Sequence, residues 1–209
     1  MKGFFITGTD TGIGKTVISA ILTLALQGYY WKPVQTGSAN EIVDQERVRE
    51  LTGLSPAHFL SSSYCFHAAL SPHQAAKHEG RSIDLEQCGL PESAGPLIVE
   101  GAGGVYVPLN AQQCMLDLMQ QLDLPVIIIC RGTLGTINHT LLTIDALRQR
   151  NLFIHGVIFN GELLTENRDT IEQWGKVKTL LHIPQLNLTR ELFRAWIFAQ
   201  QTEVLAALR

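Results

Sequence analysis

The nine residues GTDTGIGKT, Gly8 to Thr16, decide the fold of this chain. The apolar run before them, residues 2–7, predicts a strand, and the apolar-faced pattern after them, residues 17–27, predicts a helix. A glycine-rich turn that ends in Gly-Lys-Thr between a strand and a helix is typical of a phosphate-binding loop. The turn amides and the positive helix start surround polyphosphate, Lys15 adds a cation, and the Thr16 hydroxyl is placed to hold Mg²⁺.

The loop departs from the usual pattern at one position. The spacing G-x-x-x-x-G-K-[ST] puts a glycine at position 9, where this chain has Thr9, and the upstream glycine is Gly8 instead. A chance Gly-Lys-Thr tripeptide is the alternative explanation. The strand before the loop and the helix after it favour nucleotide binding.

Composition limits the classes of function. Charged residues make up 17% of the 209 residues and hydrophobic residues 45%, whereas roughly 25% charged residues is usual in soluble domains. We therefore expect part of the surface to be covered by self-association; a compact α/β monomer with an apolar sheet is the alternative. A net charge of −3 and a pI near 6.1 provide no basic surface for nucleic acid.

The chain carries no sign of secretion or membrane insertion. Its four cysteines are widely spaced and include no C-x-x-C pair, which fits a reducing compartment better than disulfides or zinc. No signal-peptide pattern precedes the first strand, and no apolar run approaches the roughly 18 residues of a membrane span. We expect a soluble, cytoplasmic protein.

Short apolar runs alternate with helical patterns along the chain. Continuous apolar runs such as residues 96–99 and 126–129 are typical of strands buried on both faces. The predicted strands are Gly3–Thr7, Tyr29–Val34, Pro96–Glu100, Pro125–Cys130, Ile154–Asn160 and Lys178–Ile183. The predicted helices are Val17–Gln27, Asp44–Leu51, Gln74–Glu79, Met115–Leu122, Ile137–Arg150, Thr165–Gly175 and Thr189–Leu208.

This alternation predicts an α/β fold, a doubly wound and mostly parallel sheet with helices on both faces, of the P-loop NTPase type. The chain has no internal repeat and no low-complexity segment, so we expect residues 1–209 to form a single domain. The least regular stretch, Ser55–Ser71, is predicted to be a long loop over the sheet.

Polar and glycine residues follow the predicted strands. Ligands of an open α/β sheet bind at the carboxyl ends of its strands, so these residues are candidates for one shared site. After the phosphate loop, the candidate segments are Lys32–Gly37, Glu100–Gly104, Arg131–His139 and Asn160–Gly161.

Four side chains in or near these segments suit phosphate chemistry. Glu100 opens a Gly-Ala-Gly-Gly turn and is placed to bind the Mg²⁺ of a nucleotide; a strand-ending glutamate is the alternative. Lys32 points either at solvent or at an anionic substrate, where with Lys15 it would neutralise charge during phosphoryl transfer. Asp44 is a second metal ligand or a helix cap, and Thr36 offers a hydroxyl or belongs to an ordinary turn.

Other segments allow two readings each. Gly135–His139 opens a helix that favours an anion, unless Thr136 simply caps it. Asn160 contacts a base edge or forms an Asn-Gly turn, and Ser71–His73 lines a pocket or is an ordinary proline loop. The apolar stripe in residues 192–208 has a weak cationic excess, which predicts packing on the sheet or a partner subunit rather than on a membrane.

Taken together, these motifs resemble the dethiobiotin synthetases, the ATP-dependent carboxylases of biotin synthesis. The family has its own form of the phosphate loop, with the first glycine shifted as in this chain. Related amidases and partition ATPases share the loop but not the other motifs. The motifs that carry the resemblance are Gly8–Thr16, Lys32-Pro33-Val34, Ser71-Pro72-His73, Glu100–Gly104 and Gly135–His139, in the family's order.

The resemblance implies a homodimer that uses ATP, Mg²⁺ and CO₂ to close a ureido ring on 7,8-diaminopelargonic acid. One amine takes up CO₂ as a carbamate, whose oxygen attacks the ATP γ-phosphate to give a carbamic–phosphoric anhydride. The second amine then displaces phosphate. Neither a nucleic acid nor a membrane is an implied partner.

The resemblance also implies roles for individual residues. It implies that Lys32, Lys15 and Thr11 serve catalysis and that Thr16, Asp44 and Glu100 hold the metal. The implied substrate contacts are Thr36, Ser71 and Pro72, with Gly135 and Asn138 from the neighbouring subunit. The implied nucleotide contacts are Gly12, Ile13, Gly14, Lys15, Thr16, Val17, Asp44, Glu100, Gly101, Ala102, Gly103, Asn160, Pro184, Gln185 and Leu186.

The chain departs from the family at two places. Gly28 alone separates the first predicted helix from the second strand, and the residues beyond Gly161 match poorly. In that region Leu181-His182 replaces the usual Leu-Gly before Ile183, so the preference for one nucleotide base is the least determined feature.

Two other functions share the loop. A cobyrinate-type amidase needs ammonia from a glutaminase, for which 209 residues leave no room unless a partner subunit supplies it. A partition-type ATPase switch would carry a lysine early in the loop, where this chain has Thr9-Asp10, and a cationic tail, which is weak here.

Overall fold

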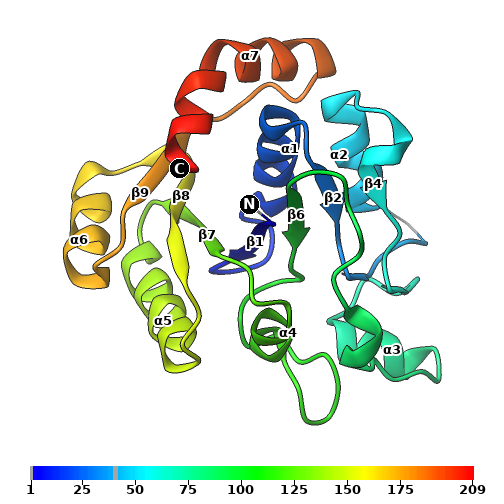
Figure 1. The fold of residues 1–209 in the computed structure, drawn as a ribbon. Helices are drawn as coiled ribbons and strands as arrows, with labels where there is room; N and C mark the ends of the chain where they lie inside the picture. The colour runs from blue at the N-terminus through cyan, green and yellow to red at the C-terminus, as the bar shows by residue number, and fades with distance from the viewer. Residues whose placement is uncertain (1, 40–41) are drawn as a thin grey trace.

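One twisted sheet of seven parallel strands runs through the centre of the molecule (Figure 1). This computed structural model describes residues 2–39 and 42–209. The strands are β1 Gly3–Gly8, β2 Tyr29–Trp31, β4 Phe59–Leu60, β6 Leu97–Glu100, β7 Val126–Gly132, β8 Ile154–Leu163 and β9 Thr179–Ile183. Their order across the sheet is β4-β2-β6-β1-β7-β8-β9, which confirms the predicted doubly wound α/β fold.

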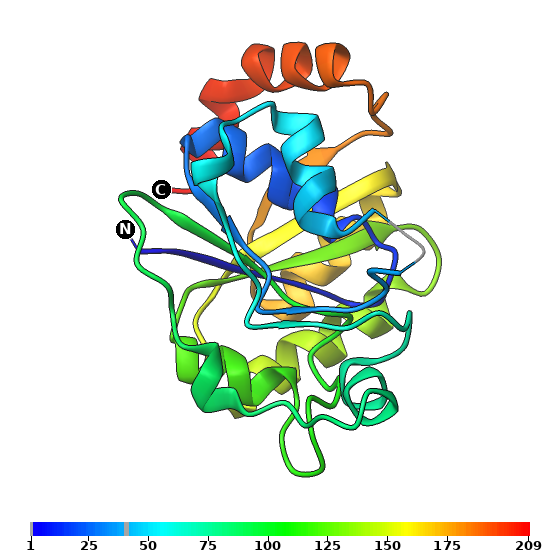
Figure 2. The same cartoon turned by 90° about the vertical axis from the view of Figure 1, so that its right-hand side faces the viewer.

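Helices cover both faces of this sheet (Figures 1 and 2). One layer consists of α1 Lys15–Leu26, α2 Asp44–Thr52 and α7 Arg190–Ala207. The other consists of α3 Pro72–His78, α4 Met115–Leu122, α5 Thr136–Gln149 and α6 Thr165–Gly175. Because successive strand residues point to opposite faces, Phe4 and Ile6 pack in the α1 layer and Phe5 packs in the other.

The predicted second strand, Tyr29–Val34, is wrong in its length. β2 ends at Trp31, and Val34–Gln35 forms a separate strand, β3, which pairs with β5 (Tyr64–Cys65) in a second, two-stranded sheet. Pro33 lies at the break; it has no N–H for a sheet, and its carbonyl accepts from Tyr64 N at 3.0 Å. The break leaves Lys32 just past the end of the central sheet.

The predicted long loop over Ser55–Ser71 is also wrong. This stretch contains a 3₁₀ turn at Pro56–His58 and then β4 and β5, and β4 extends the central sheet beside β2. Each of these strands has only two residues, which is too short to produce a periodic pattern in the sequence. A second 3₁₀ turn lies at Leu85–Cys88.

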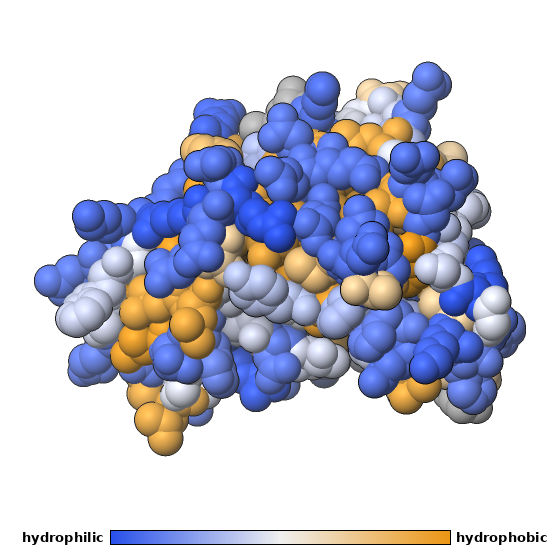
Figure 3. Space-filling model, turned by 90° about the horizontal axis from the view of Figure 1, so that it is seen from below, coloured by the Kyte–Doolittle hydropathy of each residue, from blue (hydrophilic) through white to orange (hydrophobic). Residues whose placement is uncertain are grey.

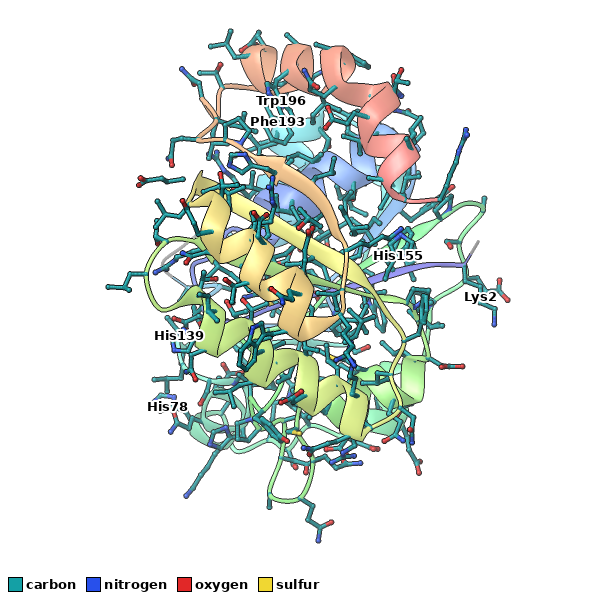
Figure 4. The ribbon with its side chains drawn as sticks, turned by 90° about the vertical axis from the view of Figure 1, so that its left-hand side faces the viewer. Lys2, His78, His139, His155, Phe193 and Trp196 are labelled. Carbon is teal, nitrogen blue, oxygen red and sulfur yellow. The ribbon has the colours of Figure 1, made fainter. Side chains whose placement is uncertain are left out.

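The C-terminal helix α7 packs mainly against α1 and α2, with a smaller contact to β9. The apolar stripe was predicted to pack on the sheet or a partner subunit; Phe193, Ile197 and Val204 are buried in the α1 layer, whereas Leu192 is exposed. Phe193 lies on the inner side of this helix (Figure 4) and is completely buried. The Arg190 Nε donates to the Glu50 carbonyl at 2.6 Å, and the Arg194 guanidinium donates to the Thr52 carbonyl. Both arginines therefore bind the carbonyl end of α2. Among the described residues, no helix has the length and apolar character needed to cross a bilayer.

We predict that Phe193→Ala lowers the free energy of unfolding by about 3–5 kcal/mol, the usual cost of truncating a buried phenylalanine. Leu192 is the matched control because it is the neighbouring residue and is 54% exposed. Leu192→Ala is expected to change stability by less than about 1 kcal/mol. Urea denaturation followed by circular dichroism measures both, and equal losses would contradict this placement of α7.

Candidate functional site

The phosphate loop connects the end of β1 to the start of α1, as its sequence predicts. Gly14 precedes the helix with φ 97°, a left-handed conformation that favours glycine. Gly8 is the shifted glycine: a Cβ there would overlap the Ile13 side chain, which folds back across the loop. A side chain at Gly8 would require Ile13 to move, and this packing favours glycine at the shifted position. The Lys15 ammonium donates to the Asp10 carbonyl at 2.9 Å within the loop.

Four polar side chains from four parts of the chain meet beside the loop. The Lys32 Nζ lies 2.6 Å from Asp44 Oδ2 and 3.0 Å from Glu100 Oε1. The Thr16 Oγ1 lies 2.6 Å from Asp44 Oδ1 and 3.0 Å from the same Glu100 oxygen. Lys32 follows β2, Glu100 ends β6, Thr16 belongs to the first turn of α1, and Asp44 is the first residue of α2.

Charge inside this cluster is balanced by close pairing. Burial by itself lowers the pKa of Lys32, but Glu100 and Asp44 outweigh it and raise the pKa. Burial raises the pKa of Asp44, but Lys32 and the hydrogen bonds of the cluster lower it below its ordinary value. Burial, reinforced by repulsion from Lys32, lowers the pKa of Lys15 to about 8. Lys32 is thus held as a cation between the carboxylates, while no carboxylate of the described residues 2–39 and 42–209 forms an ion pair with Lys15.

Two residues that the sequence analysis did not single out complete the cluster. The Tyr30 hydroxyl, fully buried, donates to Glu100 Oε2 at 3.0 Å. Burial and then the charge of Glu100 raise the pKa of Tyr30 well above its ordinary value. The Gln35 Oε1 accepts from the backbone N–H of Asp44 at 3.3 Å, at the start of α2. The period-two spacing of Tyr30 and Lys32 predicts that both side chains lie on the same face, but it does not reveal the contact of Tyr30 with Glu100.

A cavity of about 800 Å³ opens beside this cluster. The phosphate loop and the start of α1 form one wall, with residues Thr11, Gly12, Gly14, Lys15, Thr16 and Val17. The opposite wall includes Thr36, Ser71 and Pro72, and Lys32, Asp44, Glu100, Ala102 and Gly103 lie between the walls. The structure therefore brings most of the predicted site residues to one cavity.

The oxygen donors at the cluster fit a magnesium ion. Mg²⁺ is usually held by one or two carboxylates together with phosphate and water oxygens, and it prefers hard oxygen ligands. Asp44 and Glu100 supply carboxylates and Thr16 supplies a hydroxyl. The Thr16 Oγ1 lies within 3.0 Å of one oxygen of each carboxylate. In residues 2–39 and 42–209 no group of three or more His, Cys, Asp or Glu side chains is arranged to hold a metal. The two carboxylates and the hydroxyl leave coordination positions that phosphate and water oxygens would fill.

Other predicted nucleotide contacts lie just outside the cavity. The Asn160 amide donates to the Ile13 carbonyl at 2.9 Å and fills the space beside Gly14. Ile183 pairs with Asn160 across the sheet, so the segment Pro184, Gln185 and Leu186 follows at the same rim. Pro184 and Gln185 are exposed and Leu186 packs partly against the α1 layer. Gly101 also lies outside, against the Phe5 ring.

The predicted anion site at α5 lies apart from the cavity. Gly135 precedes α5 with φ 89°, and Thr136 donates its hydroxyl to the Arg131 carbonyl at 2.5 Å rather than capping the helix. Neither Gly135 nor Asn138 lines the cavity of its own chain. His139, near the carboxyl ends of the strands, and His155, near the start of β8 at the amino ends, mark the two ends of the sheet in Figure 4.

A second cavity of about 640 Å³ lies between the phosphate loop and α5. Thr11 lines both cavities, and His139, Leu142 and Tyr106 line the second one. Leu142 and Tyr106 are more than half exposed. The face seen in Figure 3 is mostly hydrophilic but carries separate apolar patches.

Comparison with known proteins places the chain in a family. An AAA domain family model matches residues 2–191. The chain is 44% identical over 200 residues to the ATP-dependent dethiobiotin synthetase BioD of Novosphingobium aromaticivorans, covering 96% of each. The chain belongs to the ATP-dependent dethiobiotin synthetase family. This confirms the resemblance drawn from the sequence motifs.

Two further relatives agree with this membership. The BioD of Rhodopseudomonas palustris strain HaA2 is 46% identical over 95% of this chain and 93% of its own length. The biotin biosynthesis bifunctional protein BioCD of Bordetella avium is 48% identical over 90% of this chain. The match spans only 40% of that bifunctional protein.

Solved structures share the fold at low sequence identity. A ParA family ATPase from Chlorobium tepidum superimposes with a TM-score of 0.55 and 12% identity, covering 100% of this chain and 95% of that one. The MinC:MinD complex of Aquifex aeolicus gives a TM-score of 0.55 at 16% identity, with 100% and 93% covered. These matches confirm the P-loop fold class.

We predict that Lys32→Met lowers the free energy of unfolding by about 3 kcal/mol in EDTA, because it leaves the buried Glu100 and the partly buried Asp44 without their cation. Mg²⁺ is expected to restore much of this loss and to raise the melting temperature of the variant more than that of the wild type. Differential scanning fluorimetry with and without MgCl₂ measures both effects.

The matched control is Arg47→Met, which removes a cation from an exposed ion pair with Glu50. Such pairs contribute about 0–1 kcal/mol, so neither the loss nor the response to Mg²⁺ is expected there. An equal response of both variants to Mg²⁺ would show that Asp44 and Glu100 do not form the metal site.

Proposed function

We propose that this chain converts 7,8-diaminopelargonic acid, CO₂ and ATP to dethiobiotin, ADP and phosphate in a Mg²⁺-dependent reaction. The observation that carries the proposal is the placement of Lys15 and Lys32 in the wall of one cavity. The phosphate loop faces this cavity from one side, and Thr36, Ser71 and Pro72 face it from the other. Family membership supplies the substrate class.

The reaction proceeds in three steps. One substrate amine adds to CO₂, loses a proton and becomes a carbamate. A carbamate oxygen attacks the γ-phosphorus of ATP, and the bond to ADP breaks, which gives a carbamic–phosphoric anhydride. The second amine attacks the carbamic carbon, closes the ureido ring and expels phosphate. Each step uses a nucleophile that the substrate itself carries.

The main obstacle is the repulsion between two anions, the carbamate and the γ-phosphate. Fixed cations aimed at the developing charge lower this barrier because they need no reorganisation during the reaction. Lys15 would contact the phosphates from the loop, and Lys32, which lines the same cavity beside the carboxylates, would neutralise charge at the γ-phosphate. Thr11 lines both cavities and is positioned to contact the phosphate or the carbamate.

Thr16, Asp44 and Glu100 are the residues that would hold Mg²⁺, with phosphate oxygens and water as the remaining ligands. When bound, the ion supplies positive charge to the β- and γ-phosphates. Lys32 contacts both carboxylates and so keeps this site occupied by a cation before nucleotide arrives. The family resemblance implies that Asn160 and the segment Pro184–Leu186 would contact the nucleotide base; Asn160 lies beside Gly14 and pairs with Ile183, which supports a shared rim.

We infer that the enzyme is a cytoplasmic homodimer. The family resemblance implies that Gly135 and Asn138 contact the substrate carboxylate from the neighbouring subunit, and their position outside the cavity of their own chain is compatible with that role. The free N–H groups at the start of α5 favour such an anion. The second cavity and the exposed Tyr106 and Leu142 provide an apolar surface for the subunit contact.

We predict that purified protein forms dethiobiotin from diaminopelargonic acid, bicarbonate and MgATP, with one ADP released per product. Mass spectrometry of the product and a coupled ADP assay measure the two quantities. ATP hydrolysis that ignores the diamine, with no ureido product, would show that the chain is a different ATPase.

We predict that Lys32→Ala reduces turnover by about 100-fold or more, the usual effect of removing one electrostatic contact to the transition state. Nucleotide affinity is expected to remain, because Lys15 and the loop amides still bind the phosphates. Steady-state kinetics and calorimetry with MgADP separate the two effects at a temperature where the variant is folded. Turnover close to that of the wild type would remove Lys32 from the mechanism.

A further inference from the structure

A buried tyrosine, Tyr30, contacts the cluster from the core of the α1 layer. The Tyr30 hydroxyl donates to Glu100 Oε2 at 3.0 Å, and both side chains are 1% exposed or less. The other oxygen of the same carboxylate, Oε1, takes the contacts with Lys32 and Thr16. The two oxygens of Glu100 are therefore distinguished by their partners.

The sheet register explains this arrangement. β2 and β6 are parallel neighbours in which Tyr30 lies opposite Ile98. Glu100 is two residues beyond Ile98 and Lys32 two residues beyond Tyr30, so all four side chains lie on the α1 face of the sheet. The long side chain of Tyr30 reaches forward along this face to the carboxylate, and its ring stays in the apolar layer beside Phe59, with ring centroids 6.4 Å apart.

We propose that Tyr30 is a positioning residue that holds Glu100 so that only Oε1 is offered to the metal, and that this orientation favours Mg²⁺ over Ca²⁺. The proposal rests on the metal site of the proposed function. Tyr30 acts through Glu100 and touches neither the metal nor the nucleotide.

Ion chemistry gives the reason for selectivity. Mg²⁺ is small, demands octahedral geometry and takes one oxygen from each carboxylate, whereas Ca²⁺ accepts six to eight ligands and readily takes both oxygens of a carboxylate. Tyr30 uses one of the two lone pairs of Oε2, so in the two-oxygen mode the ion would share this oxygen with a buried hydrogen bond and compete with it for electron density. Outer partners of this kind typically change metal affinity 10–100-fold when they are removed.

The test uses Tyr30→Phe, which keeps the ring and its packing and removes the hydroxyl alone. The probe is a non-hydrolysable β,γ-imido analogue of ATP, whose Kd is measured by calorimetry in EDTA, in saturating Mg²⁺ and in saturating Ca²⁺. The ratio of the metal-free Kd to each metal-bound Kd reports how strongly each ion is coupled to the nucleotide.

For Tyr30→Phe we expect a metal-free Kd within about twofold of the wild type and a Mg²⁺ ratio about tenfold lower, in line with the effect of outer metal partners. The Ca²⁺ ratio should fall by much less, because the freed Oε2 can now join Ca²⁺. In a Glu100→Gln background the same tyrosine change should alter neither ratio.

Tyr64→Phe is the matched control. Tyr64 is also a buried tyrosine, but its hydroxyl contacts the backbone of Asp84, with a 3.0 Å bond from the Asp84 N–H, away from the cluster. Its removal should change stability without changing either metal ratio.

Three results would overturn the proposal. Unchanged Mg²⁺ coupling in Tyr30→Phe would show that the hydroxyl does not position Glu100, although dethiobiotin formation and the metal site could both stand. An equal decrease of the Mg²⁺ ratio and the Ca²⁺ ratio would show that Tyr30 has a structural role and does not select between the ions. A wild-type protein in which Mg²⁺ leaves nucleotide affinity unchanged would overturn the metal site of the proposed function and this proposal with it.

Discussion

The Lys32 ammonium between Asp44 and Glu100 is the interaction on which the rest of the site depends. It connects three elements that the chain places far apart: the end of β2, the start of α2 and the end of β6. Two carboxylates this close would repel one another without a cation, and the nearly complete burial of Glu100 would make that repulsion costly. The same negative charge that requires Lys32 also prepares the cluster for a divalent ion.

The central position of β1 makes this convergence possible. β1 pairs with β6 on one side and β7 on the other, so the loop that follows it lies beside the ends of both. The pairing of β1 with β6 thus fixes the position of the Glu100 carboxylate relative to the phosphate loop. The two arginines of α7 hold the far end of α2, the helix whose first residue is Asp44. Packing on the side away from the cavity therefore supports the geometry inside it.

Much of this arrangement could be predicted from the sequence, because strand ends in a parallel sheet share one rim. The phosphate-loop motif predicted the place of Lys15 and Thr16, and the strand-end rule made Lys32 and Glu100 candidates for the same site; all four line one cavity. The position of Asp44 could not be predicted in this way, because a polar loop separates it from β3 and its sequence fits a helix cap equally well. β4 and β5 were missed because two residues carry no periodicity. The roles of Asn160, Gly135 and Asn138 remain predictions.

Tyr30 shows what kind of residue a motif-based reading overlooks. In the sequence it is one of three aromatic residues in an apolar strand, and such residues usually form core. The ring does lie in the core, and only its hydroxyl reaches the site. Period two would have placed Tyr30 on the same face as Lys32, but nothing in the strand specifies that a carboxylate lies within its reach. That information comes from the register with β6, which pairs residues about seventy positions apart. The contacts of buried polar atoms near strand ends thus depend on which strands pair and in which register. Through Tyr30, a residue of the core contacts a side chain of the candidate site.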